Sequence, residues 1–279
     1  MIVLRDANEM RNWSLARRAE GKRIGVVPTM GALHEGHASL MCAAATHDDV
    51  AIATIFVNPA QFAPHEDFDQ YPRTWEADVA LAEASGVVTI YAPKASLMYP
   101  PGYSTYVSVE GVSEGLCSLT RPHFFRGVAT VVTKLFTATL PHRAYFGQKD
   151  AQQCAVIKRM AADLDLGVEI VEMPIVREPD GLAMSSRNRY LSPEERQRAL
   201  CISKALFAAE EMLRAGERDA ETVVAAVRAG MEALKIDYVE LVDAGTMKPV
   251  ARVAGEVTLA VAAFCGATRL IDNIKFRAE

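Results

Sequence analysis

The 279-residue sequence lacks the marks of several large protein classes. Its five cysteines are odd in number and form no C-x-x-C pair, which argues against a disulfide framework and a structural zinc site. No apolar run approaches the roughly 18 residues that cross a membrane. The first residues contain no apolar signal-peptide segment. These absences predict a cytoplasmic protein.

An excess of positive charge is also missing. Lys plus Arg number 30 and Asp plus Glu number 35, so the net charge is −5, and no long basic run occurs. This composition argues against nucleic-acid binding. The glycine patterns of dinucleotide-binding and P-loop enzymes, G-x-G-x-x-G and G-x-x-x-x-G-K-[ST], are absent too. A small anionic ligand, bound by local basic residues, remains consistent with the sequence.

The first 175 residues alternate short apolar runs with amphipathic stretches, which predicts βαβ units. Continuous apolar runs are typical of buried parallel strands. We expect strands at 24–27, 50–57, 87–91, 144–147 and 168–171, and helices at 37–46, 74–85, 128–140 and 151–163. The sequence therefore predicts an α/β fold with a Rossmann-like parallel sheet in a domain spanning residues 1–175.

The pattern changes after residue 175, which predicts a smaller α+β domain at 176–279. Ser192, Pro193 and Glu195 form a capping box with proline at the first helical position, so a long helix should begin there and run to about residue 214. A second helix is expected at about 219–234. Strand-like runs at 238–242, 257–263 and 269–273, separated by turns, favour an antiparallel sheet.

A histidine-containing motif follows the first predicted strand. Residues 28–37 read PTMGALHEGH and open the first predicted helix. Ligands of open parallel sheets bind beyond the carboxyl ends of the strands, and a helix N-terminus there offers N–H groups that suit phosphate. We interpret His34 and His37 as donors to phosphate oxygens, with Gly36 allowing the backbone to approach the ligand closely.

This motif has two competing interpretations. The histidines can be ordinary surface residues at a helix N-terminus, or they can bind a metal ion. However, H-x-G-H differs from the helical zinc motif H-E-x-x-H, and no third ligand is evident. The position at the strand-to-helix turn favours phosphate binding.

A second motif, Met184-Ser185-Ser186-Arg187, lies on the loop between the predicted domains. Guanidinium and hydroxyl groups suit phosphate oxygens, and a mobile loop would allow them to close over a triphosphate. Alone, this motif is a weak signal, and a solvated loop explains it better. Beside H-x-G-H it resembles the HIGH and KMSKS pair of the adenylating nucleotidyltransferases, the superfamily of class I aminoacyl-tRNA synthetases.

Polar residues also follow the fourth and second predicted strands. In 146–153, Lys149 offers a point charge for phosphate, Asp150 suits a helix cap or a ribose, and Gln153 presents an amide. In 56–62, Asn58 and Gln61 present neutral amides suited to a small polar acid. The alternatives are a capped helix and an ordinary turn. The loop that continues past residue 62 is long enough to suggest a lid or an interface.

Together these motifs resemble the pantothenate synthetase (pantoate–β-alanine ligase) family. The resemblance covers essentially the whole chain and rests on 28–37, NPAQF at 58–62, YPR at 71–73, FGQKD with Gln153 at 146–153 and MSSRN at 184–188. It implies condensation of pantoate with β-alanine through pantoyl-adenylate, releasing pyrophosphate and AMP. It also implies ATP as co-substrate, a Mg²⁺ requirement, a homodimer and a C-terminal domain that closes as a lid.

The resemblance also assigns roles to residues. Those that would stabilise charge on the phosphates are His34, His37, Lys149, Ser185, Ser186 and Arg187. Those that would line the ATP site are Pro28, Thr29, Met30, Gly36, Gly147, Asp150, Val176 and Met184. Gln61 and Gln153 would bind pantoate, and Gln61 would also face β-alanine. Weaker candidates near the acid or the phosphates are Asn58, Tyr71 and Arg121. No metal ligand is assigned, and Asp78 is the one residue considered for Mg²⁺.

Three rival functions are consistent with part of the pattern. Another nucleotidyltransferase of the superfamily would keep H-x-G-H without the clusters at 58–61 and 149–153. A tRNA synthetase would need tRNA-binding domains for which 279 acidic-leaning residues leave little room. A non-catalytic module would bind ATP and form no AMP. Pyrophosphate release with and without pantoate, and then with β-alanine, separates these functions.

Overall fold

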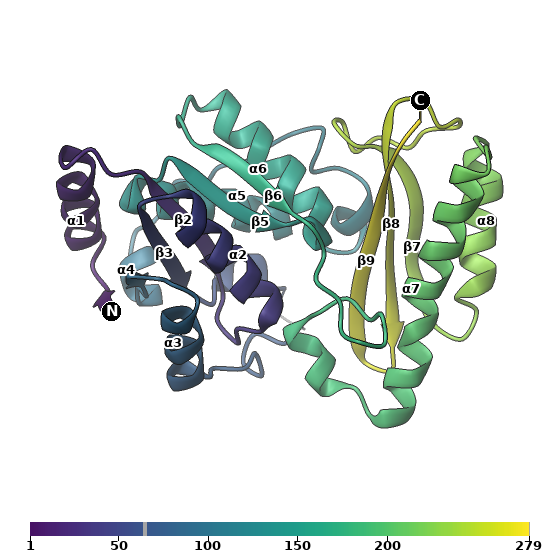
Figure 1. Cartoon of the computed structure of the whole chain (residues 1–279), viewed down its shortest axis with the longest axis horizontal. Helices are drawn as coiled ribbons and strands as arrows, with labels where there is room; N and C mark the ends of the chain where they lie inside the picture. Colours follow the sequence, from purple (N-terminus) through teal and green to yellow (C-terminus); the bar gives the residue numbers. More distant parts are fainter. Residues whose placement is uncertain (64–65, 279) are drawn as a thin grey trace. The chain divides into compact units, whose positions relative to one another are not determined.

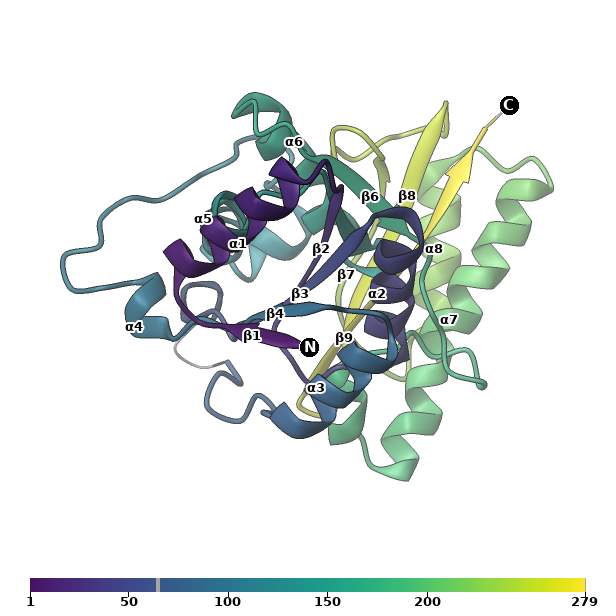
Figure 2. The ribbon, with the colours of Figure 1, turned by 60° about the vertical axis from the view of Figure 1, so that its left-hand side comes forward.

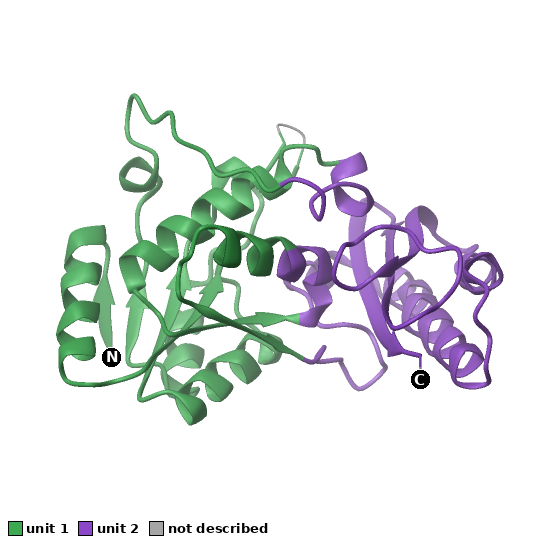
Figure 3. Ribbon diagram, turned by 90° about the horizontal axis from the view of Figure 1, so that it is seen from above, with its two compact units in different colours: residues 1–109, 121–147, 156–173 green, residues 110–120, 148–155, 174–279 purple. Residues whose placement is uncertain are grey.

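The computed structural model describes residues 1–63 and 66–278 and divides into two compact units (Figure 3). The N-terminal unit comprises residues 1–109, 121–147 and 156–173. The C-terminal unit comprises residues 110–120, 148–155 and 174–279. Each unit contains one sheet.

The sheet of the N-terminal unit has six strands in the order β1-β4-β3-β2-β5-β6, and every neighbouring pair is parallel. Thr29 at the end of β2 lies beside Ile55 at the end of β3, so the segments that follow both strands start at one edge of the sheet. The predicted α/β class is confirmed. The strands are β1 (Ile2–Leu4), β2 (Ile24–Thr29), β3 (Val50–Ile55), β4 (Thr89–Tyr91), β5 (Arg143–Gly147) and β6 (Glu169–Met173).

Helices cover both faces of this sheet (Figures 1 and 2). On one face lie α2 (Glu35–His47) and α3 (Trp75–Ala84), and on the other lie α1 (Ala7–Ala19) and α5 (Phe124–Thr139). Leu40 and Met41 of α2 pack with strand residues such as Val27 and Ala53 in one buried cluster. Burial from both faces explains why the strands read as continuous apolar runs. Shorter helices of this unit are η1 (Pro59–Gln61) and α4 (Ala95–Met98).

The first strand and first helix were not expected from the sequence. Strand β1 has three residues at the sheet edge, and Ile2 and Val3 are exposed, so its apolar run is too short to stand out. Helix α1 buries only Met10 and Ser14, which leaves a weak apolar stripe. Its N-terminus is nevertheless marked by Asp6, whose carboxylate accepts two backbone N–H bonds.

The C-terminal unit pairs an antiparallel sheet with two helices. Strands β7 (Lys235–Asp243), β8 (Glu256–Cys265) and β9 (Thr268–Arg277) form a meander. Helices α7 (Pro193–Arg214) and α8 (Ala220–Gly230) lie along one face of it (Figure 1). The core between these layers is apolar and includes Leu206, Val223, Val261 and Leu259. The predicted α+β character of this part is confirmed.

The start of α7 follows its sequence signal. Ser192 accepts the backbone N–H of Glu195, and the Glu195 carboxylate accepts the backbone N–H of Ser192. Pro193 occupies the first helical position. Helix α8 ends at Gly230, four residues before the predicted end, because the chain from Lys235 onward already pairs in β7.

Two short segments from the N-terminal half belong to the C-terminal unit: 110–120, which contains η2 (Leu116–Leu119), and 148–155, which contains η3 (Gln148–Asp150) and the start of α6 (Ala151–Asp163). Gln152 joins them. Its buried amide accepts the N–H of Cys117 and donates to the carbonyls of Val112, Glu114 and Gly115. The candidate residues at 149–153 are therefore part of the C-terminal unit.

Candidate active site

The H-x-G-H motif forms the turn between β2 and α2. His34 is the N-cap of α2, and its Nδ1 accepts the backbone N–H of Gly36 at 3.2 Å. Nδ1 of His37 accepts the backbone N–H of His34 at 3.3 Å. The two rings lie 4.1 Å apart between centroids. The histidines therefore form a capping box, a role usually taken by Ser or Thr with Glu or Gln.

This capping arrangement fixes the tautomer of both rings. A neutral imidazole carries its proton on one nitrogen only, and a nitrogen that accepts a hydrogen bond cannot be that one. With Nδ1 as acceptor in His34 and His37, the proton lies on Nε2. Each ring can then donate from Nε2, at a helix N-terminus where an anion is favoured.

The turn before the histidines is held by Asp78 of α3. Its Oδ2 accepts the N–H of Ala32 at 3.0 Å, and its Oδ1 accepts the N–H of Leu33 at 2.8 Å and the hydroxyl of Thr74 at 2.9 Å. Gly31 and Ala32 have φ of 84° and 50°, the left-handed region that costs a non-glycine residue energy. The buried carboxylate offsets that cost, since it satisfies two N–H groups that only this conformation presents.

This position bears on the Mg²⁺ interpretation of Asp78. The side chain is 2 % exposed, and both of its oxygens already accept hydrogen bonds from the turn and Thr74. Among residues 1–63 and 66–278, no group of three or more His, Cys, Asp and Glu side chains could hold a metal ion. The residues described thus provide no protein cage for Mg²⁺, and Asp78 serves the backbone.

Replacing Asp78 should destabilise the N-terminal unit. Asp78→Ala leaves two N–H groups of a mostly buried turn without an acceptor, so we expect the free energy of unfolding to fall by about 2–3 kcal/mol. Urea unfolding followed by circular dichroism measures the change. Asp69→Ala, at an exposed carboxylate of the same unit, is the control. Equal denaturation midpoints for Asp78→Ala and the wild type would rule out this role.

The segment after β3 places Gln61 beside the first motif. Asn58 caps η1 and is 1 % exposed, and its Nδ2 donates to Oε1 of Gln61 at 3.1 Å. The Gln61 amide nitrogen in turn lies 3.1 Å from Sδ of Met30. The two predicted clusters, at 28–37 and 58–62, thus meet at one edge of the sheet. Asn58 fixes the Gln61 side chain with its carbonyl toward Asn58 and its amide nitrogen toward Met30.

Two residues that the sequence analysis did not single out complete this arrangement. Oη of Tyr99 donates to Oδ1 of Asn58 at 2.7 Å. Burial raises the pKa of Tyr99, so its hydroxyl remains a proton donor. Gly127 of α5 lies under η1, and a Cβ there would approach the carbonyl oxygen of Ala60 to 2.3 Å. Only glycine allows η1 to sit this close to α5.

Tyr71 and Arg121 support the loop that carries Gln61. Tyr71 is buried, and its ring meets that of Phe62 edge-on at 6.1 Å. Arg121 donates to both carboxylate oxygens of Glu66, at 2.5 and 2.7 Å, and to the carbonyl of Gln61 at 3.2 Å. Arg121 therefore fixes the backbone of the same residue whose side chain Asn58 orients.

In the C-terminal unit, Lys149 lies in η3 near Arg187. Burial lowers the pKa of Lys149, the positive charge of Arg187 lowers it further, and Asp150 and Asp272 oppose the shift. Two cations near each other raise the local positive potential. Such a potential suits the binding of phosphate.

The loop that carries Ser185, Ser186 and Arg187 is anchored within its own unit. Residues 177 and 183 form an antiparallel bridge, and the N–H of Met184 donates to the carbonyl of Val176 at 3.0 Å. Ser185 then caps η4 (Ser186–Tyr190) through the N–H of Arg187. These contacts tie the motif to the C-terminal unit.

The remaining candidate residues are distributed between the units. Pro28 and Thr29 end β2, and Gly147 ends β5, all in the N-terminal unit. Asp150, Gln153 and Val176 belong to the C-terminal unit. The structure thus brings the predicted residues together as two sets, one in each unit. The N-terminal set includes His34, His37 and Gln61, and the C-terminal set includes Lys149 and Arg187.

Comparison with known proteins decides which superfamily member this arrangement represents. A family model described as pantoate-beta-alanine ligase matches residues 2–275. The chain belongs to the pantoate–β-alanine ligase family. The resemblance drawn from the motifs is confirmed over the whole chain, which leaves no basis for assigning it to another nucleotidyltransferase family.

Proteins similar to this chain match it over nearly their full lengths. It is 55% identical to the pantothenate synthetase of Myxococcus xanthus, covering 99% of this chain and 97% of that protein. It is 52% identical to the pantothenate synthetase of Acetivibrio thermocellus, covering 98% and 99%. The crystal structure of pantoate-beta-alanine ligase from Thermus thermophilus superposes with a TM-score of 0.93 at 41% identity, covering 98% and 99%.

A further solved relative contains ligands. The pantoate-beta-alanine ligase of Francisella tularensis, in complex with beta-gamma ATP and beta-alanine, is 30% identical, covers 98% of this chain and 97% of its own, and has a TM-score of 0.77.

In the part of this family member that the structure describes, no helix is long and apolar enough to cross a membrane.

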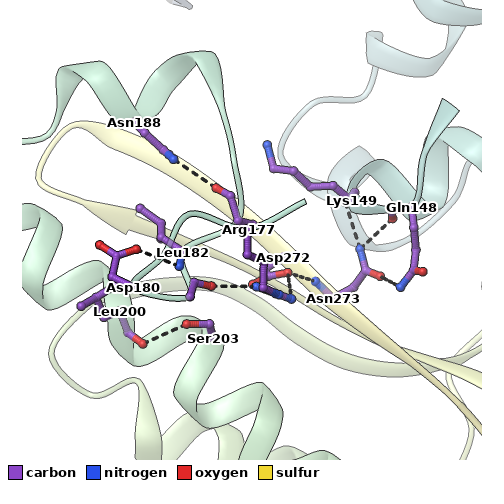
Figure 4. A network of polar contacts seen from close by, with 12 residues as sticks. Gln148, Lys149, Arg177, Asp180, Leu182, Asn188, Leu200, Ser203, Asp272 and Asn273 are labelled. Carbon is purple, nitrogen blue, oxygen red and sulfur yellow. Dashed lines mark hydrogen bonds and ion pairs between the residues drawn. The ribbon is translucent and has the colours of Figure 1, made fainter. Parts of the chain in front are cut away.

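Sequence reasoning missed Asp78 as the residue that holds the first motif, and it missed Tyr99, Gly127 and Asn273 of β9 (Figure 4). Gly127 and Tyr99 gave no signal, because their partners are distant in sequence. Asp78 and Asn273 did give one. A carboxylate on the inner side of a predicted helix and an amide within a buried strand are both unfavourable unless they have partners.

Proposed function

We infer that this chain is an ATP-dependent ligase that joins pantoate to β-alanine. In the first step the pantoate carboxylate attacks the α-phosphorus of ATP, giving pantoyl-adenylate and pyrophosphate. In the second the amine of β-alanine attacks the mixed anhydride, giving pantothenate and AMP. The observation that carries this inference is the full-length match to the pantoate–β-alanine ligase family.

The chemistry needs no enzymic nucleophile, because the substrate carboxylate is the nucleophile. The protein's contribution is to position the reactants and to stabilise charge on the phosphates. The amine of β-alanine must be neutral to attack, and no residue of the motifs is a strong base. In the second step, the neutral form of the amine is thus favoured either by desolvation or by a histidine that accepts its proton.

Pyrophosphate release tests this function directly. The purified protein should release pyrophosphate from ATP only when pantoate is present, and it should form pantothenate and AMP only after β-alanine is added. A coupled pyrophosphate assay with chromatography of the products measures both steps. Pyrophosphate release that is independent of pantoate, or product without AMP, would overturn the proposal.

The residues of the N-terminal set are proposed to bind pantoate and the phosphates of ATP. His34 and His37 donate from Nε2, and the segment from Pro28 to Gly36 together with Gly147 contacts the nucleotide. Gln61, whose side chain Asn58 orients, binds the pantoate carboxylate or hydroxyl groups and faces β-alanine. Tyr71 and Arg121 act by holding the Gln61 loop, as their contacts support.

The C-terminal set is proposed to act on the same ATP. Lys149 and Arg187 neutralise charge that develops on the phosphates, and Ser185 and Ser186 add neutral donors. Asp150, Val176 and Met184 contact the nucleotide, and Gln153 binds pantoate. The C-terminal part, 176–279, is proposed to act as a lid over the ATP- and pantoate-binding part, 1–175. Residues 110–120 and 148–155 would move with the lid, because they belong to its unit.

Three further properties are proposed from the resemblance to the family. Mg²⁺ is expected to enter as MgATP, because magnesium is usually held by substrate phosphates with few protein ligands, and the described residues offer no cage. The chain is expected to be a cytoplasmic homodimer. Analytical ultracentrifugation at micromolar concentration tests the dimer.

Gln61→Ala should mainly weaken the use of pantoate. A hydrogen bond to a charged partner is worth about 1.5–3 kcal/mol, so we expect the KM for pantoate to rise about tenfold or more, with a smaller change in the KM for ATP. Gln61→Glu, which keeps the shape but removes the amide donor, should behave similarly. Steady-state kinetics with each substrate varied measures this. An unchanged KM and kcat for pantoate would contradict the assignment.

A further inference from the structure

Two consecutive residues of β9 hold the two loops that carry the cations of the C-terminal unit (Figure 4). Asn273 contacts the turn of Lys149, and Asp272 contacts the loop that begins at Arg177. Successive side chains of a strand point to opposite faces. Strand β9 therefore holds one loop on each face of the sheet. Neither residue belongs to the motifs by which the family is recognised.

Asn273 is bound to the Lys149 turn by three side-chain hydrogen bonds. Its Nδ2 donates to the carbonyls of Gln148 and Lys149, both at 2.9 Å. Its Oδ1 accepts from Nε2 of Gln148 at 3.2 Å. The side chain is 2 % exposed, and Ala260, directly opposite on β8, is small enough to leave it room. Such a fully satisfied buried amide specifies one arrangement of the chain.

These bonds determine the direction in which the Lys149 side chain leaves the backbone. The carbonyl of Gln148 belongs to the peptide unit before the Cα atom of Lys149, and the carbonyl of Lys149 belongs to the unit after it. Fixing both planes fixes the direction of the bond from Cα to Cβ. Figure 4 shows the Lys149 side chain extending away from Asn273, so the amide orients the lysine without touching its ammonium group.

Asp272 holds the neighbouring loop through an ion pair. Its carboxylate is 3 % exposed and accepts two bonds from Arg177, at 2.6 and 2.9 Å. Arg177 also donates to the carbonyl of Gly181 at 3.1 Å. The backbone N–H of Asn273 donates to the same carboxylate at 2.8 Å. The two anchors are thus joined at adjacent residues.

We propose that Asn273 is a positioning residue for catalysis, which sets the orientation of Lys149 toward the phosphates of ATP. This inference rests on the role proposed for Lys149 in adenylate formation. A displacement of about 1 Å at a charge-stabilising group is enough to cost a large factor in rate. Asn273 therefore acts through Lys149, and its removal affects the adenylation step more than the affinity for pantoate.

A double-mutant cycle tests the proposal. Asn273→Leu should lower the kcat for pyrophosphate release at least tenfold in the wild type and cause no further loss in a Lys149→Ala background. Asn273→Asp, which keeps an acceptor for Gln148 but loses both N–H donors, should behave the same way and serves if the leucine variant folds poorly. An equal fold-loss in both backgrounds would overturn the proposal, because it would indicate a structural role alone.

Val261→Ala is the matched control. Val261 is fully buried on β8 directly opposite Asp272, so the variant weakens the same sheet while every hydrogen-bonding group of Asp272 and Asn273 is kept. Its thermal midpoint should fall at least as far as that of Asn273→Asp, while its kcat at 25 °C stays within twofold of the wild type. A tenfold loss in Val261→Ala would overturn the proposal, since any weakening of the sheet would then suffice.

A chemical readout separates failure of the proposal from failure of the proposed function. Brief labelling with acetic anhydride, followed by peptide mass spectrometry, compares Lys149 with the exposed Lys204. The ratio of acetylation at Lys149 to acetylation at Lys204 should rise severalfold in Asn273→Leu, which adds no charge, and stay constant in Val261→Ala. An unchanged ratio in Asn273→Leu overturns the anchoring, whatever the kinetics show. A Lys149→Ala enzyme with normal turnover overturns the role of Lys149 in the proposed function, and with it the catalytic part of this inference.

Discussion

Lys149→Ala is expected to slow adenylate formation about 100-fold or more while leaving the fold intact. Loss of one preorganised donor to a developing charge typically costs 10²–10³ in rate. The ammonium of Lys149 is the donor proposed here, with its backbone fixed by β9 and its field strengthened by burial. Single-turnover pyrophosphate release with ATP and pantoate measures the loss. Near-native turnover of a folded variant would refute the role.

The stability of this variant should move in the opposite direction from its activity. Burial lowers the pKa of Lys149 in the folded chain below its unfolded value, so between the two values the unfolded chain binds more protons. Stability then rises with pH through that window. Lys149→Ala should abolish this rise, and below the window it should be at least as stable as the wild type. Urea unfolding across the alkaline range measures both effects.

The same shift gives activity a pH dependence. The cation of Lys149 is present below its lowered pKa and lost above it, so kcat/KM for ATP should decline on the alkaline side through that pKa. Lys149→Ala should lack this decline. Lys204→Ala, at an exposed lysine of α7, should keep both the rate and the profile of the wild type.

His37→Ala is expected to reduce adenylate formation by a similar factor, about 100-fold. Its Nε2–H is the proposed donor to the phosphates, and its Nδ1 caps the helix through the N–H of His34. The alanine variant loses both functions. Rapid-quench measurement of pyrophosphate at saturating ATP and pantoate gives the rate.

Two substitutions separate the donor from the cap. His37→Asn places an oxygen near the position of Nδ1, so it keeps a cap acceptor and loses the Nε2 donor. His37→Gln reaches further and can present an N–H near the position of Nε2. We expect the asparagine variant to be stable and slow, and the glutamine variant to be faster than it. His47→Ala, at the exposed end of α2, is the control. A fast asparagine variant would mean that His37 only caps the helix.

The fold was predictable where one local signal dominated. Apolar runs buried from both sides identified β2 to β5, and the capping box with Pro193 placed the start of α7. Strand β1 and helix α1 were missed because the first is short and the second has little apolar surface. Their stability comes from pairing with β4 and packing on α5, contacts between segments about 85 residues or more apart in sequence.

The candidate site was predictable as a set of residue types. The sequence placed histidines, amides, serines and cations after strands and on one loop, and the roles of these groups are the ones proposed above. The supporting residues were not predictable. Asp78 reaches the first motif from α3, Tyr99 reaches Asn58 across 41 residues, and Asn273 reaches Lys149 across 124. Such partners form hydrogen bonds with polar groups that lose their contact with water only when the chain folds.

The sequence by itself determined the two architectures, the family and the chemical groups of the site, because apolar periodicity and motif spacing are local properties of the chain. Only the tertiary structure decided which unit each group belongs to. Lys149 follows a strand of the parallel sheet in sequence, yet the amide of Asn273 and the bonds of Gln152 place it in the C-terminal unit. The reason is that a buried polar group is stable only beside its hydrogen-bond partners, and their positions depend on the whole fold.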